Sequence, residues 1–262
     1  MAIILGKKTY GRLETLQYTN DKFKWGKVVI GISCFYGFWA FLLAKLLKRK
    51  SIYYAIDFYS PKIAEDWIDS IFIWSAMMMD KFLCRFCDEV WDISDRINEG
   101  RFEYGKYYGA SIIVPLSYPP SYFRFHQGNK KKVVFVGIEP YGLELIDVVW
   151  IKNKPLDLLL WELSYSGIGI SLWKDKGNNY YGDPGKTKLY SACGLPVIMT
   201  DNTPYAQVIN ETQAGLIVPY DKKAVREAIR EIQENYEFFK GNVPKTWKYI
   251  NADVLRNIKI LD

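Results

Sequence analysis

Side chains that bind transition metals are scarce in this chain. Its 262 residues include one histidine, His126, and four cysteines. Cys84 and Cys87 have the spacing of a zinc or redox half-site, but they lie in an apolar, helix-like stretch without a second ligand pair, which favours a plain core role. His126 lies in a basic connector and is expected at the surface. We therefore expect neither a metal site nor a resident cofactor.

A Walker A loop is also missing. Its pattern, G-x-x-x-x-G-K-[ST], is matched at the last three positions by Gly185, Lys186 and Thr187, but Tyr180 stands where the first glycine is required. No segment resembles a secretory signal peptide, and the few cysteines suit a reducing compartment. We therefore expect a cytoplasmic protein.

Apolar and aromatic residues are abundant. The chain is 49% hydrophobic and 24% charged, which is typical of a folded globular protein of one or two domains. Aromatic residues make up 16% of it and suit contacts with sugar rings, bases or a membrane surface. The net charge of +6 favours polyanionic partners. The longest basic runs, 48–50 and 130–132, lie at the ends of predicted elements, which argues against a nucleic-acid interface.

An uncharged stretch at 28–44 is open to two interpretations. It is either a short transmembrane helix with basic residues after it, or a buried strand over 28–32 followed by a helix over 35–48. The second is favoured because another strand-like run, SIYYAI, follows at 51–56, and strand, helix and strand in succession are typical of a parallel sheet. In either case the aromatic helix and its basic end predict a peripheral membrane contact through 35–50.

Short apolar strands alternate with helices along both halves of the chain. This pattern predicts an α/β protein made of two Rossmann-like domains. Prolines, glycines and lysines between 115 and 132 interrupt the alternation and mark the boundary. We expect a short first domain over 1–118, a linker over 119–131, a second domain over 132–245, and a C-terminal helix over 246–262 that packs back on the first domain.

A loop rich in glycine, asparagine and tyrosine precedes a short predicted helix that opens at Lys186. A helix N-terminus presents unpaired N–H groups and the positive end of the helix dipole, so it favours a phosphate. Lys186 would add a full charge, and the Thr187 hydroxyl a hydrogen bond. Pro184 and Gly185 would let the backbone approach the ligand closely. The sequence therefore predicts a phosphate site here.

The segment that follows this loop resembles the donor domain of the nucleotide-sugar glycosyltransferases of the GT-B type, especially family 4. The run 133–137 resembles the first strand and the glycine turn of that domain, and 215–219 resembles a later strand. The matching positions, in the order and spacing of the family, are Pro184, Lys186, Tyr190, Ala192, Gly194, Pro196, Val197 and Ile198.

The resemblance implies two Rossmann-like domains that face a cleft, with the donor held mainly by the C-terminal domain and the acceptor by the N-terminal one. It implies transfer of a sugar from a UDP- or GDP-sugar to a hydroxyl of a glycan, lipid or protein without an obligatory metal. The chain contains no Asp-x-Asp, the motif with which the alternative GT-A fold holds a divalent cation on the diphosphate. Lys186 would then stabilise the departing diphosphate.

Candidate site residues follow from this resemblance and from their positions at strand ends. Asp57 follows an apolar strand, so it could take the acceptor proton in an inverting reaction or position the sugar in a retaining one. A helix cap before Pro61 is the alternative role for Asp57. Tyr59 and Ser60 would line the same acceptor-side edge. The candidate donor-binding residues are Gly137, Lys174, Gly182, Asp183, Pro184, Gly185, Lys186, Thr187 and Tyr190.

The sequence also departs from the family pattern. The two family glutamates would fall at Tyr181 and Leu189, neither of which is acidic. The ribose contact would then come from a neighbour such as Asp183 or Tyr190. The arginine that usually follows the first strand of the donor domain is missing. The first half is short for this fold, so a homo-oligomer could complete the cleft. The alternative function is a non-catalytic scaffold of the same fold, or a basic nucleic-acid-binding protein.

Overall fold

The computed structural model describes residues 2–6, 12–64, 66–137, 146, 148–174 and 178–257. The chain forms two compact units. Unit 1 comprises Met1–Leu116, Gly177–Asp183 and Leu255–Asp262, and unit 2 comprises Ser117–Lys176 and Pro184–Val254. Each unit contains a five-stranded sheet, and every strand pairing in both sheets is parallel. The α/β prediction of two Rossmann-like halves is confirmed.

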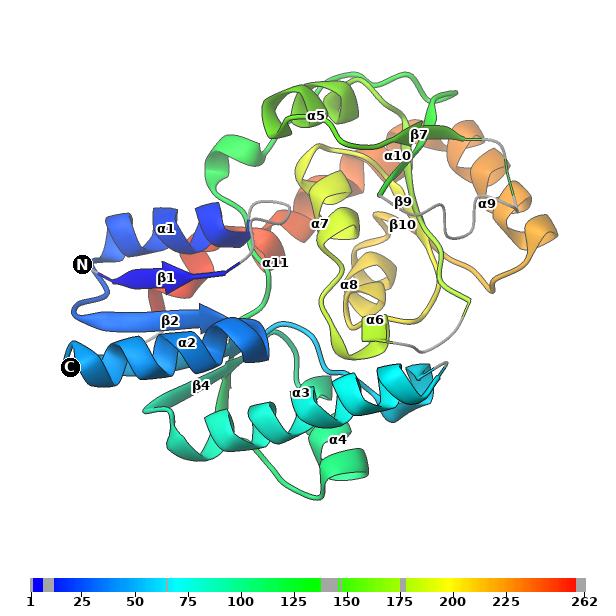
Figure 1. Ribbon diagram of the computed structural model, residues 1–262. Coiled ribbons are helices and arrows are strands. Elements are labelled where there is room, and N and C mark those ends of the chain that lie inside the picture. Colours follow the sequence, from blue (N-terminus) through cyan, green and yellow to red (C-terminus); the bar gives the residue numbers. More distant parts are fainter. Residues whose placement is uncertain are drawn as a thin grey trace. The chain divides into compact units, whose positions relative to one another are not determined.

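Unit 1 is built on a sheet whose strands follow one another in chain order (Figure 1). The strands are β1 (Ile3–Leu5), β2 (Val28–Ile32), β3 (Lys50–Ala55), β4 (Glu89–Asp92) and β5 (Ser111–Ile113). The helices between them are α1 (Arg12–Phe23), α2 (Ser33–Leu46), α3 (Trp67–Phe86) and α4 (Arg96–Gly100), and a π-helical turn over Arg101–Gly105 continues α4. All five residues of β2 are buried, as expected for a parallel strand that is covered on both faces.

The uncharged stretch at 28–44 is a strand followed by a helix, as predicted. β2 ends at Ile32, and α2 begins at Ser33. The helix lies close to the strand because two glycines face each other: a Cβ on Gly31 would lie 2.5 Å from the Cα of Gly37. Across the residues that the structure describes, no helix has both the length and the apolar character needed to cross a bilayer.

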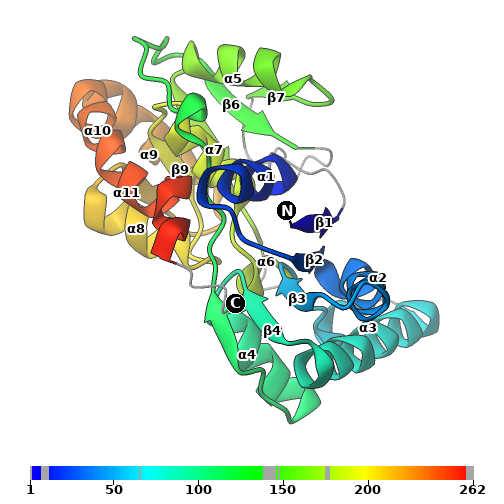
Figure 2. The ribbon, with the colours of Figure 1, turned by 90° about the vertical axis from the view of Figure 1, so that its left-hand side faces the viewer.

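Unit 2 contains the second sheet, in the order β10-β9-β8-β6-β7. Its strands β6, β7 and β9 are labelled in Figure 2. Its strands are β6 (Val133–Val136), β7 (Val149–Ile151), β8 (Ile168–Ser171), β9 (Val197–Met199) and β10 (Gly215–Ile217). Its helices are α5 (Leu156–Ser164), α7 (Gly185–Ala192), α8 (Tyr205–Thr212), α9 (Lys222–Glu234), α10 (Tyr236–Asn242) and α11 (Trp247–Ile250). One face of α9 belongs to a core cluster that also contains residues of the strands. Its members on α9, at helical spacing, are Val225, Ala228 and Ile232.

The order of the second sheet reverses between β6 and β8. β7 flanks β6 on one side, whereas the following strands β8, β9 and β10 continue on the other. In open α/β sheets, ligands bind outside the carboxyl ends of the strands at such a reversal. The topology of unit 2 therefore marks the residues that follow β6 and β8 as the place for a ligand.

The boundaries between the units differ from those expected. Residues 119–131, expected as a linker, are part of unit 2. The short helix α6 (Asn178–Tyr181) comes from the second half of the sequence but belongs to unit 1. In place of one helix over 246–262, α11 ends at Ile250 and a 3-10 helix covers Ala252–Asn257. From Leu255 onward the described residues belong to unit 1.

Candidate ligand site at the switch point of unit 2

Lys186 lies at the reversal of the second sheet. It is the second residue of α7, and its Nζ lies 4.0 Å from the ring centroid of Trp173 and 4.3 Å from that of Phe135. Phe135 belongs to β6, and Trp173 follows β8. The ammonium group is therefore positioned by side chains from the two strands between which the sheet order reverses.

The charge of Lys186 is poorly compensated. Within the described part of the chain it has no ion-pair partner, and burial lowers its pKa to about 7. The two rings attract the cation through their π-systems, which replaces part of the lost hydration. Near neutral pH a substantial fraction of Lys186 is therefore uncharged, and a bound anion would favour the charged form.

The backbone at the start of α7 is also ready to bind an anion. Pro184 occupies the N-cap position and provides no side-chain cap, and the first backbone bond of the helix runs from the Lys188 N–H to the Pro184 carbonyl over 3.1 Å. The Thr187 side chain is buried, and its Oγ1 has no hydrogen-bond partner among the described residues. A buried hydroxyl without a partner costs about 1 to 3 kcal/mol. Thr187 directly follows Lys186 in the first turn of α7.

Two further buried hydroxyl groups lie at or after the ends of the neighbouring strands β8 and β9. Ser171 ends β8, and Thr203 precedes α8. Both side chains are buried, and their hydroxyl groups have no partner in the part of the chain that the structure describes. The Trp173 N–H donates to Thr200 Oγ1 over 3.0 Å, and Asn202 Nδ2 donates to the Trp173 carbonyl over 2.9 Å. These contacts hold the Trp173 backbone in place. A sequence signal could have identified these hydroxyl groups: serine and threonine residues that end or follow apolar strands.

Tyr190, one of the predicted donor residues, lies in the core of unit 2. Its side chain is fully buried, and its hydroxyl accepts a hydrogen bond from the Val136 N–H over 2.7 Å and donates one to the Ile170 carbonyl over 3.2 Å. The ring fills the space above Gly169, where a Cβ would lie 2.4 Å from it. Tyr190 thus joins β6 to β8 from inside the core.

Other predicted donor residues of unit 2 lie at the same strand ends. Gly137 directly follows β6, donates its N–H to the Ile151 carbonyl over 3.2 Å, and accepts from Trp150 Nε1 over 2.8 Å. Lys174 is exposed after β8. The Gly185 carbonyl accepts from the Tyr118 hydroxyl over 2.8 Å. The replacements for the family arginine, residues 138 and 139, lie outside the described residues.

Gly182 and Asp183 belong to unit 1 and are buried there. The Asp183 carboxylate accepts a hydrogen bond from the Leu116 N–H over 2.8 Å. Just before it, α6 is held by Ser94, whose hydroxyl donates to the Tyr181 carbonyl over 2.5 Å. Asp183 therefore anchors this segment within unit 1, a structural role that the motif spacing did not reveal.

The two positions of the family glutamates offer no carboxylate. The Tyr181 ring packs against Phe58 at 5.1 Å within unit 1, and Leu189 is fully buried in α7. Neither provides a hydrogen-bond acceptor comparable to a glutamate.

Two of the predicted site residues of unit 1 line a narrow cavity. Asp57 and Tyr59 line it together with Cys34, Tyr53 and Asp80. Desolvation, together with the charge of Asp57, raises the pKa of Tyr59 to about 12.

The cap before Pro61 is not Asp57. It is Ser60, whose Oγ accepts from the Lys62 N–H over 3.3 Å at the start of the 3-10 helix Pro61–Ile63.

A buried ion-pair network supports the floor of this cavity. Arg101 is fully buried; its Nε and Nη2 donate to both carboxylate oxygens of Asp80 at 2.8 and 3.0 Å, and its Nη1 donates to Asp92 at 2.8 Å. Desolvation raises the pKa of Asp80, but Arg101 and the hydroxyls of Tyr53 and Tyr107 outweigh it, so the net shift is downward. Burial raises the pKa of Asp92. No pattern in the sequence predicted this network.

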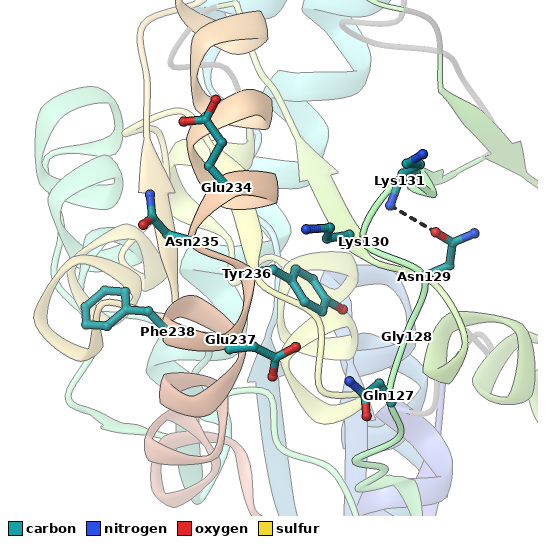
Figure 3. A pocket seen from close by; sticks show the side chains of 10 residues that line it. All are labelled: Gln127, Gly128, Asn129, Lys130, Lys131, Glu234, Asn235, Tyr236, Glu237 and Phe238. Carbon is teal, nitrogen blue, oxygen red and sulfur yellow. Dashed lines mark hydrogen bonds between the residues drawn. The ribbon is translucent and has the colours of Figure 1, made fainter.

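A wide hollow in unit 2 has a volume of about 680 Å³ (Figure 3). Residues 127–131 and 234–238 line it. The first of these segments directly precedes β6, so the hollow lies at the amino ends of the strands. Across the described ranges, the buried Tyr236 hydroxyl has no hydrogen-bond partner. Since ligands of open α/β sheets bind at the carboxyl ends, the group around Lys186 is the better candidate despite the size of the hollow.

No protein-family description matches the sequence, and no curated protein does. Solved structures do match. HepE from Anabaena, in complex with UDP-glucose, gives a TM-score of 0.68 at 8% identity over 96% of this chain and 82% of that one. Sucrose-phosphate synthase from Thermosynechococcus elongatus gives a TM-score of 0.67 at 13% identity over 93% of this chain and 74% of that one. WaaG, a glycosyltransferase involved in lipopolysaccharide biosynthesis, gives a TM-score of 0.58 at 11% identity over 95% of this chain and 80% of that one. At these identities the likeness is one of fold, and it confirms the expected GT-B fold.

Proposed function

We propose that the protein is a glycosyltransferase that moves a sugar from a UDP- or GDP-sugar to an acceptor hydroxyl. The observation that carries this proposal is the position of Lys186, a desolvated lysine without an ion-pair partner among the described residues, at the switch point of the second sheet. The GT-B fold supports the choice of donor class, since HepE, which shares it, was solved with UDP-glucose.

The donor diphosphate would lie at the start of α7. Lys186 would contact the phosphate oxygens, while the first N–H groups of the helix and the Thr187 hydroxyl would donate further hydrogen bonds. As the bond to the sugar breaks, negative charge grows on the leaving diphosphate, and these fixed donors would stabilise it. They supply the charge that a divalent cation supplies elsewhere, and the absence of Asp-x-Asp supports transfer without a metal. Gly137 and Lys174 would lie near the donor, because they follow β6 and β8.

The acceptor would be handled by unit 1. Asp57 is half-buried beside Tyr59, and its carboxylate can accept a hydrogen bond from an acceptor hydroxyl. In an inverting reaction it would take the hydroxyl proton, and in a retaining one it would orient the acceptor. Tyr59, with its raised pKa, stays protonated and can donate a hydrogen bond to the sugar. The acceptor hydroxyl would belong to a glycan, a lipid or a protein.

Thermal unfolding with UDP and GDP tests the donor site. A nucleotide at 100 times its Kd stabilises the folded protein by about 2.7 kcal/mol. We expect stabilisation by one of the two nucleotides, with or without EDTA, and its loss in Lys186→Met. The matched control is Lys223→Met, which removes an exposed lysine on α9 that lies 3.9 Å from Glu227. Equal stabilisation of the two variants would rule out Lys186 as the phosphate contact.

Release of UDP from UDP-glucose separates an enzyme from a scaffold of the same fold. We expect slow hydrolysis of at least one nucleoside-diphosphate sugar in the absence of an acceptor, and less of it in Lys186→Met. A protein that binds the nucleotide but releases none from any donor would be a scaffold.

A further inference from the structure

Two neighbouring helices of unit 1 expose large apolar side chains. α2 and α3 lie side by side (Figure 1), joined by a stacked contact between Phe35 and Phe72 at 5.5 Å and an edge contact between Phe41 and Phe82 at 5.4 Å. Away from this seam, the two helices present an apolar surface that we call the α2/α3 face. It consists of Trp39, Leu42, Leu46, Trp67, Ile71 and Trp74.

The exposure of these side chains follows from helical spacing. In α3, Trp67, Ile71, Trp74 and Met78 recur every three or four residues and form a single stripe. The exposed fractions of Trp67 and Trp74 are 71% and 65%, and that of Trp39 on α2 is 64%. Leu83 on the opposite side of α3 is fully buried. Soluble monomers rarely expose a contiguous apolar patch of this kind unless it binds something.

Positive charge continues the same surface. The stripe of α3 runs on through Lys81 and Arg85 to the end of the helix. Both helices connect parallel strands, so they run in the same direction and their C-terminal ends lie together. Residues 33–50 and 67–86 together contain six cations and two carboxylates, and one of the latter, Asp80, is buried against Arg101. At the end of α2 these cations are Lys45, Lys48, Arg49 and Lys50.

We infer that the α2/α3 face binds the surface of a lipid bilayer that carries anionic head groups. Tryptophan side chains favour the boundary between acyl chains and water, and lysines at the edge of the face would contact the head groups. The helices would lie in the plane of the interface with their apolar stripe inserted. A second copy of the chain is a poorer occupant, because it would set a face rich in cations against itself.

The apolar end of the α2/α3 face adjoins the acceptor-side cavity within unit 1. Phe72 of α3 contacts the Tyr59 ring edge-on at 5.4 Å, and Tyr59 lines the cavity beside Asp57. An acceptor held in the same bilayer would therefore reach Asp57 from this edge. This consequence rests on the proposed function, whereas bilayer binding itself does not.

Vesicle flotation with the full chain tests the inference. The probes are vesicles of phosphatidylcholine alone and of phosphatidylcholine with 30% phosphatidylglycerol. We expect binding to the anionic vesicles, and at least a tenfold loss in the double variant Trp39→Ser/Trp74→Ser. The matched control is Trp161→Ser, which removes a tryptophan of 63% exposure from α5 in unit 2 and should leave binding unchanged.

The charge contribution is tested separately. The triple variant Lys45→Gln/Lys48→Gln/Lys50→Gln should bind anionic vesicles roughly 100-fold more weakly, at about fivefold for each cation. Circular dichroism and UDP binding, measured on the same variants, show whether the fold and the donor site are intact. Failure of the wild-type protein to float with anionic vesicles would overturn the inference, even if UDP binds. A dimer that Trp39→Ser/Trp74→Ser dissociates would also overturn it, because it would assign the face to a second copy.

Discussion

Binding of UDP should draw a proton from solution, and Lys186 should be its destination. With a pKa of about 7, Lys186 is protonated in about half of the ligand-free molecules at pH 7 and in about a tenth at pH 8. A diphosphate in contact would restore the charged form. At pH 8 we therefore expect an uptake of about 0.9 proton for each UDP bound, if the bound pKa returns to its ordinary value. The affinity should fall about fivefold from pH 7 to 8 and about tenfold from pH 8 to 9.

Isothermal titration calorimetry in two buffers of different ionisation enthalpy measures this uptake. At pH 8 the second ionisation of a phosphate, near pH 6, is complete, so the ligand contributes little. Lys186→Met should bind UDP weakly, with no proton uptake and little dependence on pH, while Lys223→Met should behave as the wild type. Tight binding of UDP at pH 8 without proton uptake, or the same uptake in Lys186→Met, would exclude Lys186 as the group that takes up the proton.

The remaining predictions concern stability and turnover. In unfolding experiments without ligand, Lys186→Met should stabilise the protein by roughly 2 kcal/mol at pH 6, a value discounted for partial exposure. The pKa of Lys186 is lower in the folded protein than in the unfolded chain, so the charged lysine destabilises the folded protein. The variant removes this destabilisation, which is fully present below pH 7 and disappears as the pH rises to 10.5. Tyr190→Phe should cost about 1 to 3 kcal/mol, because the Val136 N–H loses its acceptor, and calorimetry should show an unchanged Kd for UDP. Arg101→Met should cost about 3 to 5 kcal/mol in urea unfolding, since it leaves two buried carboxylates unpaired. Asp57→Asn should lower the rate of sugar transfer in a UDP-release assay while UDP binding is retained, and an unchanged rate would remove Asp57 from the mechanism.

Local patterns in the sequence were sufficient to predict the fold. Runs of apolar residues such as 28–32 and 133–136 favour strands buried on both faces, and the helical segments between successive strands favour parallel pairing. The helix that begins at 185 was predicted within one residue, because a proline and a glycine precede a short run of helix-compatible residues. These signals act over a few residues, so they can be read without knowledge of the tertiary structure.

The roles of single residues depended on contacts between distant parts of the chain. Tyr190 falls at a position of the donor motif, yet its hydroxyl joins two strands in the core. Asp183 is bound by the Leu116 N–H, 67 residues earlier in the chain. The partners of Arg101 come from α3 and β4. No spacing rule relates these residues, because such contacts arise only when the sheets have formed.

A crystal structure of the protein with UDP would show which groups hold the diphosphate. We expect one diphosphate oxygen within about 3 Å of Lys186 Nζ and another at the same distance from a backbone N–H at the start of α7. A diphosphate bound away from this helix, with Lys186 still between the rings of Phe135 and Trp173, would contradict this expectation.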